Sequence, residues 1–404
     1  MKVHSSFNQN ISFKHLLKIP FAMFISLKNK NKELISEILN LPTDNFKAYY
    51  YQSQRAAFYD FLLYLKSKNP KKEIVVLPSY TCCVLVNAVL KAGLKVEFID
   101  TKEDSLSYDP KRFQQKTNLI SEQILAILIP SNFGESFDQE FVNKYKNNYS
   151  LILDLANTLT DFNLNDFQAV LLSFGSNKLL DSVYGGSLLV DSKLNFKSKV
   201  KHINLAFEIK SIFKVFNFIF FRRFLKSFLT KSIFYIFKNL NLFPRIISNS
   251  EKRFLTNQIQ YAKSSKLLDP MLNKTLLDFK HSENSNKLKK LHASLSEYSL
   301  RDLKAKNSTC FYPILVDNPK ELHSKLINQN IFTSIEWTFS QIVPLSARLE
   351  NIQFKTEAYP NSLKLSKRLL LIPINNSLDY KSISNIIHII FDHIHENKVT
   401  NNNR

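Results

Sequence analysis

Short apolar runs recur between residues 73 and 190, and segments with helical spacing separate most of them. We interpret these runs as strands at 73–77, 95–100, 123–129, 151–155, 169–174 and 187–190. Strands that are apolar along nearly their whole length are buried on both faces, which requires a mostly parallel sheet covered by helices. The sequence therefore predicts an α/β fold.

The positions of the glycines indicate where the functional site lies. The chain has five glycines in 404 residues, and all of them lie between Gly93 and Gly186. A sequence that avoids glycine this strongly keeps it where the backbone needs a positive φ or a close approach to another group. Ligands of parallel sheets bind beyond the carboxyl ends of the strands. We therefore expect the site where the segments 78–81, 131–134, 154–157 and 173–178 meet.

The rest of the chain divides into segments of different character. Residues 207–254 hold twelve of the 34 phenylalanines, ten Lys or Arg and two acidic residues. They form either a helical insertion that packs on the body or a basic, aromatic surface that contacts a membrane or partner. We predict an N-terminal extension (1–47), a large α/β domain (48–206), a basic Phe-rich helical insertion (207–262), a linking helix region (263–281) and a small C-terminal α+β domain (282–404). The polar tail 397–404 is expected to fray.

Composition limits the partners and the location. The chain carries 55 Lys and Arg against 34 Asp and Glu, a formal charge of +21. Such a charge suits nucleic acid, an anionic membrane or a phosphorylated ligand. The wealth of Lys, Asn, Ile and Phe is also typical of an AT-rich genome, so nucleic acid is not predicted. Neither a signal peptide nor a membrane-spanning run is found, so we expect a cytoplasmic protein, or one peripheral to the inner membrane face through 207–254.

Several common kinds of site are excluded. All nine histidines lie before residue 16 or after residue 201, so a hydrolase triad in the predicted sheet core is not supported. Phosphate-binding signatures of the Walker or G-x-G-x-x-G type are absent from the sequence. Three cysteines without a C-x-x-C pair do not predict a metal site.

An acid and an amine remain at the predicted strand ends. Asp154 lies within the apolar run LILDL, where a carboxylate needs a cation or donor, so it either caps a loop or faces a protonated ring nitrogen. Lys178 follows the run AVLLSF and is either a surface lysine or a buried amine able to form a Schiff base. Ser173, five residues earlier, is either a turn serine or a donor to a phosphate.

Six segments, in this order along the chain, resemble the pyridoxal-phosphate-dependent sugar aminotransferases of the DegT/StrS family. They are SQRAA (53–57), VVLPSYTCCVLVNAVLKAGLKVEFID (75–100), AILIPSNFGE (126–135), LILDLANTL (151–159), LLSFGSNKLLDSVYGGSLLV (171–190) and LSKRLLLIPI (365–374). The most specific element is S-F-x-x-x-K followed by G-G. The resemblance covers about 48–190 well and 260–395 weakly. It implies the fold of the aspartate-aminotransferase-like transferases and the cofactor pyridoxal 5′-phosphate.

The resemblance also implies a role for each matching residue. Lys178 corresponds to the lysine that forms a Schiff base with the cofactor and then shuttles a proton. Asp154 corresponds to the partner of the pyridinium nitrogen, which it keeps protonated. Asn157 stands where the family usually has Gln or His near the cofactor hydroxyl.

The phosphate of the cofactor is expected at a helix N-terminus. The resemblance implies that Ser173 and the backbone amides around Arg55 and Ala56 hold it there. The Arg55 side chain either adds charge at the same place or lies on the helix surface. Trp337, with the loop 333–345, is expected to line the substrate pocket.

The implied activity is transfer of an amino group, usually from glutamate, to a nucleotide-linked keto-deoxy sugar for surface polysaccharide. The implied assembly is a homodimer with active sites at the interface. The sequence departs from the family at two positions. Cys82 stands where an aromatic ring usually stacks on the cofactor, and Tyr80 is the candidate substitute for that ring. Gln54 stands where the family usually has Gly. The alternative is a non-catalytic, cofactor-binding or regulatory descendant. A dehydratase of the same family is disfavoured, because it usually has His at the position of Lys178.

Overall fold

The computed structural model describes residues 27–402 apart from 176, 183, 203–208, 211–212, 215–216, 218–246, 265–267 and 376–377. The predicted Phe-rich insertion, and the membrane contact suggested for 207–254, lie largely outside the described residues. Among the helices that are described, none is long and apolar enough to cross a bilayer.

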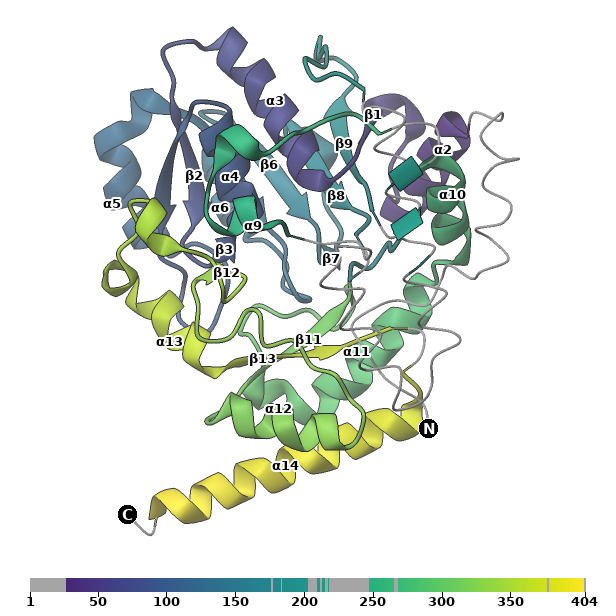
Figure 1. Cartoon of the computed structure of the whole chain (residues 1–404), viewed down its shortest axis with the longest axis vertical. Helices are drawn as coiled ribbons and strands as arrows, with labels where there is room; N and C mark the ends of the chain where they lie inside the picture. Colours follow the sequence, from purple (N-terminus) through teal and green to yellow (C-terminus); the bar gives the residue numbers. More distant parts are fainter. Residues whose placement is uncertain are drawn as a thin grey trace.

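A seven-stranded sheet forms the centre of the molecule (Figure 1). Its strand order is β1-β9-β8-β6-β5-β2-β4. The five strands from β8 to β4 are parallel, whereas β9 is antiparallel to both β8 and β1. The bounds are β1 (Phe46–Tyr51), β2 (Ile74–Pro78), β4 (Lys95–Ile99), β5 (Ile124–Pro130), β6 (Ser150–Leu155), β8 (Ala169–Ser173) and β9 (Gly186–Asp191). The predicted α/β fold with a mostly parallel sheet is confirmed.

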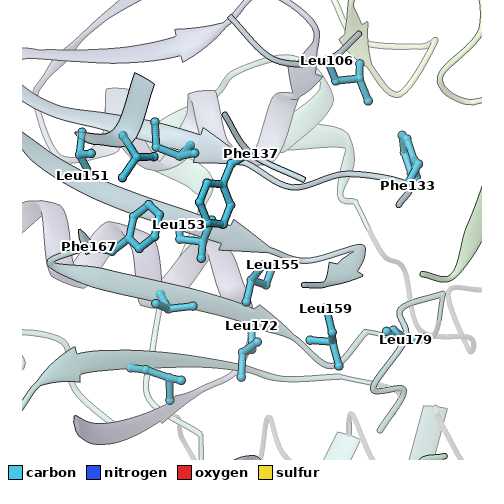
Figure 2. Packing of buried hydrophobic residues seen from close by; sticks show 14 of the residues in the cluster. Leu106, Phe133, Phe137, Leu151, Leu153, Leu155, Leu159, Phe167, Leu172 and Leu179 are labelled. Atoms are coloured by element: carbon cyan, nitrogen blue, oxygen red, sulfur yellow. The ribbon is translucent and has the colours of Figure 1, made fainter. Parts of the chain in front are cut away.

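Helices cover both faces of this sheet. Alternate residues of one strand belong to different apolar clusters: Val75 and Leu77 face one side, and Val76 faces the other. The first cluster includes α3 (Gln54–Lys68) and α4 (Cys83–Lys91), and the second includes α5 (Pro110–Ile120) and α6 (Gln139–Tyr145). Figure 2 shows part of the second cluster, where Phe137, Leu153 and Phe167 lie together. Burial on both faces explains the continuously apolar strands.

The C-terminal part is a smaller α+β unit. Strands β11 (Phe311–Leu315) and β13 (Leu369–Pro373) pair antiparallel, and α11 (His281–Leu295), α12 (Pro319–Asn328) and α14 (Tyr380–Asn402) lie together at the end of the molecule away from α3 (Figure 1). The remaining helices and strands are α2 (Lys28–Leu39), α9 (Asn249–Lys252), α10 (Leu268–Asp278), α13 (Pro360–Arg368), β3 (Thr81–Cys82), β7 (Thr158–Leu159), β10 (Ser308–Thr309) and β12 (Ile342–Val343). Short 3-10 helices are η1 (Thr43–Asn45), η2 (Ser121–Gln123), η3 (Leu164–Asp166), η4 (Thr256–Gln258), η5 (Ser296–Tyr298), η6 (Leu349–Asn351) and η7 (Thr356–Ala358).

The last helix extends into the polar C-terminal tail. Helix α14 continues to Asn402, and the expectation that 397–404 frays stays a prediction. Glu396 forms an ion pair with Lys325, and Asn397 accepts a hydrogen bond from Asn318 at 3.0 Å. These contacts tie α14 at Glu396 and Asn397 to α12 and its N-terminus.

Short pairings tie the C-terminal part to the carboxyl edge of the parallel strands. Strand β7, just after β6, pairs antiparallel with β10, and β12 pairs parallel with β3. Asn307 donates a side-chain hydrogen bond to the carbonyl of Gly134 at 2.8 Å. The loops that follow β2, β5 and β6 thus all contact residues beyond 300.

A buried carboxyl lies at this junction. Glu135 is 2% exposed; its Oε2 accepts a hydrogen bond from the N–H of Leu106 at 2.9 Å, and its Oε1 has no partner among the described residues. Burial raises the pKa of Glu135 to about 8, and the negative charge of Asp302 adds to this effect.

Glu135→Gln is expected to flatten the pH dependence of stability. The folded state holds its proton more tightly than the unfolded state does, so the free energy of unfolding falls as pH rises from about 4.5 to about 8. The slope from this one group is at most ~1.4 kcal/mol per pH unit. Denaturant unfolding across this range should show a smaller slope in the variant and higher stability at pH 8. An unchanged slope would show that Glu135 does not titrate in this way.

Candidate active site

The chemistry-bearing residues meet at the carboxyl edge of the parallel strands. Asp154 is the fifth residue of β6, and Asn157 follows the end of that strand. Lys178 lies in the loop after β8, which Ser173 ends. The N-terminus of α3 reaches the same edge because Ser53 forms a bridge with Gly185. The structure therefore brings these residues together at the edge that the strand-end rule indicated.

Asp154 is buried and held by two donors. The amide Nε2 of Gln54 donates to its Oδ1 at 2.5 Å, and the N–H of Ala156 donates to the same oxygen at 2.9 Å. Burial raises the pKa of Asp154; the two hydrogen bonds and the positive charge of Lys178 oppose that rise. Among the described residues, Oδ2 accepts no hydrogen bond. The carboxylate thus keeps one oxygen for a further donor.

Lys178 is half-buried and anchored by an amide. Its Nζ donates to Oδ1 of Asn157 at 2.6 Å, and Nδ2 of Asn157 donates to Oδ1 of Asn132 at 2.8 Å. The charge of Lys178 acts on Asp154, yet within the described part of the chain the two form no ion pair within 4 Å. The amine and the acid are therefore close, but they do not neutralise each other by contact.

The C-terminal part fixes Asn157 from behind. The carbonyl of Asn157 accepts hydrogen bonds from Oγ1 of Thr309 at 3.0 Å and from the N–H of Cys310 at 3.3 Å. Cys310 is buried, and burial raises the pKa of its thiol to about 12, so it stays a neutral thiol beside the site. Sequence reasoning missed Thr309 and Cys310, since they lie about 150 residues further along the chain and no local pattern marks them.

The first turn of α3 is the predicted phosphate site. The N–H groups of Ala56 and Ala57 donate to the carbonyl of Ser53 at 3.1 and 3.3 Å. The N–H of Ala56 thus bonds within the first turn of the helix. The phosphate-binding role of the amides around Arg55 and Ala56 stays a prediction. Ser173 is half-buried and lies opposite Gly186 in the antiparallel pairing of β8 with β9.

Arg55 has a partner that the sequence did not indicate. Its Nε lies 2.8 Å from Oε1 of Glu251, which is 3% exposed and belongs to α9. The guanidinium therefore balances a buried carboxylate, so Arg55 is neither a simple surface residue nor an arginine whose whole charge remains for a phosphate.

Cys82 and Tyr80 differ in what they offer the site. Cys82 is half-buried at the N-terminus of α4, and a hydrogen bond from Cys83, with the positive charges of Lys178 and Arg55, lowers its pKa. Tyr80 is fully buried, and its hydroxyl donates to the carbonyl of Trp337. Tyr80 thus anchors the loop around half-buried Trp337, which does not support its use as a stacking ring. That Trp337 lines a substrate pocket stays a prediction.

Gly186 sets the distance between α3 and the sheet. A Cβ at this position would lie 2.2 Å from the backbone N of Gln54 and 2.6 Å from the carbonyl carbon of Ser53. Such distances are far inside van der Waals contact, so only glycine lets the start of α3 lie directly on β9.

Gly186→Ala is expected to destabilise the protein by about 3 kcal/mol or more, because backbone atoms must move apart. Gly175→Ala is the matched control, since its Cβ would meet nothing closer than the Cγ of Lys178 at 3.7 Å. Chemical denaturation of both variants measures the difference. Equal midpoints for the two variants would contradict the close approach.

The residues at this edge fit pyridoxal 5′-phosphate. A buried carboxylate with one oxygen left over suits a protonated ring nitrogen, and a half-buried amine suits an aldehyde. A cavity of about 240 Å³ lies elsewhere, beside the amino ends of β5 and β6, and its lining, which includes Lys68, Lys72 and Lys146, contains none of the predicted site residues.

Comparisons with known proteins agree with this arrangement. Residues 60–193 match the model of the DegT/DnrJ/EryC1/StrS aminotransferase family, the family that the sequence segments resemble. No curated protein matches the chain by sequence.

Solved structures show the same fold. A Streptococcus pneumoniae protein, Spr1654, named as a sugar aminotransferase and solved in its PMP form, superposes with a TM-score of 0.67 at 12% identity, with 100% of both chains covered. Helicobacter pylori PseC, an aminotransferase involved in the biosynthesis of pseudoaminic acid, gives 0.63 at 13% identity, with 98% of this chain and 100% of PseC covered. An aminotransferase from Brucella abortus gives 0.61 at 14%, with 91% and 90% covered. The predicted fold of the pyridoxal-phosphate transferases is confirmed.

Proposed function

Since residues 60–193 match the model of the DegT/DnrJ/EryC1/StrS aminotransferase family, we propose that this chain moves an amino group from glutamate to a nucleotide-linked keto-deoxy sugar. The observation that carries the proposal is the placement of Lys178 and Asp154. They lie at one edge of the sheet, the positive charge of Lys178 acts on Asp154, and within the described part of the chain they are not in contact as an ion pair. The proposal places the cofactor ring between this amine and this acid.

Pyridoxal 5′-phosphate, when bound, supplies an aldehyde that takes up amines and a ring that withdraws electrons. Lys178 would hold the aldehyde end and, once released, move a proton at its Nζ. Its hydrogen bond to Asn157 orients that nitrogen. Asp154 would hold a proton on the ring nitrogen through Oδ2, and burial excludes the water that would weaken this interaction.

The phosphate would lie at the start of α3. The amides of Gln54 and Arg55, the hydroxyl of Ser173 and the positive end of the 15-residue helix provide the donors. The high positive charge of the chain supports a nucleotide diphosphate on the substrate and, with lower specificity, contact of 207–254 with an anionic membrane. A role in the synthesis of surface polysaccharide is part of the same proposal. We further propose a cytoplasmic homodimer with the site at its interface.

The test uses the purified protein with pyridoxal 5′-phosphate. Adding glutamate should bleach the band of the lysine-bound cofactor, and a panel of nucleotide-linked keto sugars, read by mass spectrometry, should yield one aminated product. A protein that binds the cofactor but does not respond to any amino donor would be the non-catalytic descendant, and the proposed activity would then be rejected.

A further inference from the structure

Gln54 is the residue at this edge that the sequence marked only as a departure. It is the first residue of α3, is buried, and extends its amide to a carboxylate 100 residues further along the chain. Burying a side-chain amide without a hydrogen-bond partner is unfavourable, so the buried amide of Gln54 needs an acceptor. The carboxylate of Asp154 is that acceptor.

The backbone of Gln54 is fixed with little freedom. Gly186 lies against this backbone: a Cβ on Gly186 would be 2.2 Å from the N and 2.5 Å from the Cα of Gln54. The N–H of Gly185 donates to the carbonyl of Gln52 at 3.1 Å, which holds the preceding residues on the same strand end. The side chain of Gln54 therefore starts from a defined point, and its amide reaches Asp154 across β8.

Two donors share one oxygen of Asp154. The amide of Gln54 and the N–H of Ala156 both bond to Oδ1, and they come from different sides, α3 and the residues after β6. Two fixed donors on one oxygen prevent rotation of the carboxylate about its χ2 angle. Oδ2 is left as the oxygen that accepts no hydrogen bond from the described residues.

We propose that Gln54 is a positioning residue for Asp154: it fixes the carboxylate so that Oδ2 is presented to the ring nitrogen of the cofactor. This inference rests on the proposed function for the identity of that nitrogen, while the coupling between Gln54 and Asp154 stands on the geometry alone. Gln54 does not touch the reacting atoms.

The energetic consequence has a defined sign. Burial raises the pKa of Asp154, and the Gln54 amide is one of the groups that lower it again. The positive charge of Lys178 acts in the same direction as the amide. Without the amide, the carboxylate should take up a proton at higher pH and should turn more freely.

The test begins with the protein without cofactor. Gln54→Met keeps the size of the side chain and removes the donor. Carbon-13 NMR of labelled aspartate carboxyls, with Asp154 assigned through Asp154→Asn, should show its titration midpoint about one pH unit higher in the variant. The matched control is Gln341→Met, which removes another buried glutamine, one that donates to the carbonyl of Thr356 at 3.1 Å. The control should leave the midpoint unchanged.

A second measurement links the pair to the cofactor. Titration with pyridoxal 5′-phosphate should show roughly tenfold weaker binding to Gln54→Met than to the wild type. An unchanged Asp154 midpoint in Gln54→Met, or an equal change in Gln341→Met, would overturn the positioning role. If wild type binds no cofactor while the midpoint still moves, the proposed function fails and the coupling stands.

Discussion

Lys178→Ala should abolish the absorbance band of the lysine-bound cofactor and reduce transamination by about 10⁴-fold or more. The reason is that Lys178 serves twice: it bonds the cofactor aldehyde and it moves the proton, and general acid–base catalysis alone contributes about 10²–10⁴-fold. Its Nζ is oriented by Asn157 at 2.6 Å. Absorbance spectra and steady-state rates with glutamate measure both losses.

Lys146→Ala is the matched control for this variant. Lys146 is also half-buried, but it lies at the opposite edge of the sheet and pairs with Asp166 at 2.7 Å. The control should keep both the band and the rate. An intact band in Lys178→Ala, or loss of the band in both variants, would contradict the role of Lys178.

Asp154→Asn should lower activity by about 10²–10³-fold while making the protein without cofactor more stable at neutral pH. Asparagine accepts the hydrogen bonds of Gln54 and Ala156 but cannot carry the negative charge that a protonated ring nitrogen needs. The pKa of Asp154 is higher in the folded state than in the unfolded state. The free energy of unfolding therefore falls as pH rises above the pKa that Asp154 has in the unfolded chain. Asparagine removes this effect.

Asp60→Asn separates function from burial. Asp60 is also fully buried, but four donors surround it: the hydroxyls of Tyr51 and Ser198 and the N–H groups of Lys199 and Val200. Replacing it should destabilise the protein, because the NH₂ group of asparagine would then face hydrogen-bond donors instead of offering them an acceptor. Thermal unfolding of both variants without cofactor measures the contrast. Loss of stability in Asp154→Asn as large as in Asp60→Asn would contradict the account.

Much of the fold could be predicted from the sequence because parallel strands buried on both faces are apolar throughout. The runs at 123–129 and 151–155 became β5 and β6 with boundaries shifted by one residue. Helix α5 was not predicted, because only Phe113 and Thr117 are buried on it and the rest is polar. Strand β1 was not predicted either, since it is an antiparallel edge strand with a mixed burial pattern.

The site was predictable only where chemistry and strand ends coincide. Asp154 stood out as a lone charge within an apolar strand, and Lys178 as an amine at the end of the next strand in the sheet. The partners of these residues were not predictable, because the contacts of Gln54, Glu251 and Cys310 depend on how distant segments pack. The hydrogen bond of the Ala56 N–H to the carbonyl of Ser53, within the first turn of α3, was not predicted either.

The central claim is that a single amine, that of Lys178, bonds the cofactor aldehyde at the carboxyl edge of the sheet. Reduction with borohydride after incubation with pyridoxal 5′-phosphate, followed by digestion and peptide mass spectrometry, locates the bonded lysine directly. The account predicts one stoichiometric pyridoxyl adduct, on Lys178. Adducts scattered over surface lysines, with Lys178 unmodified, would contradict it.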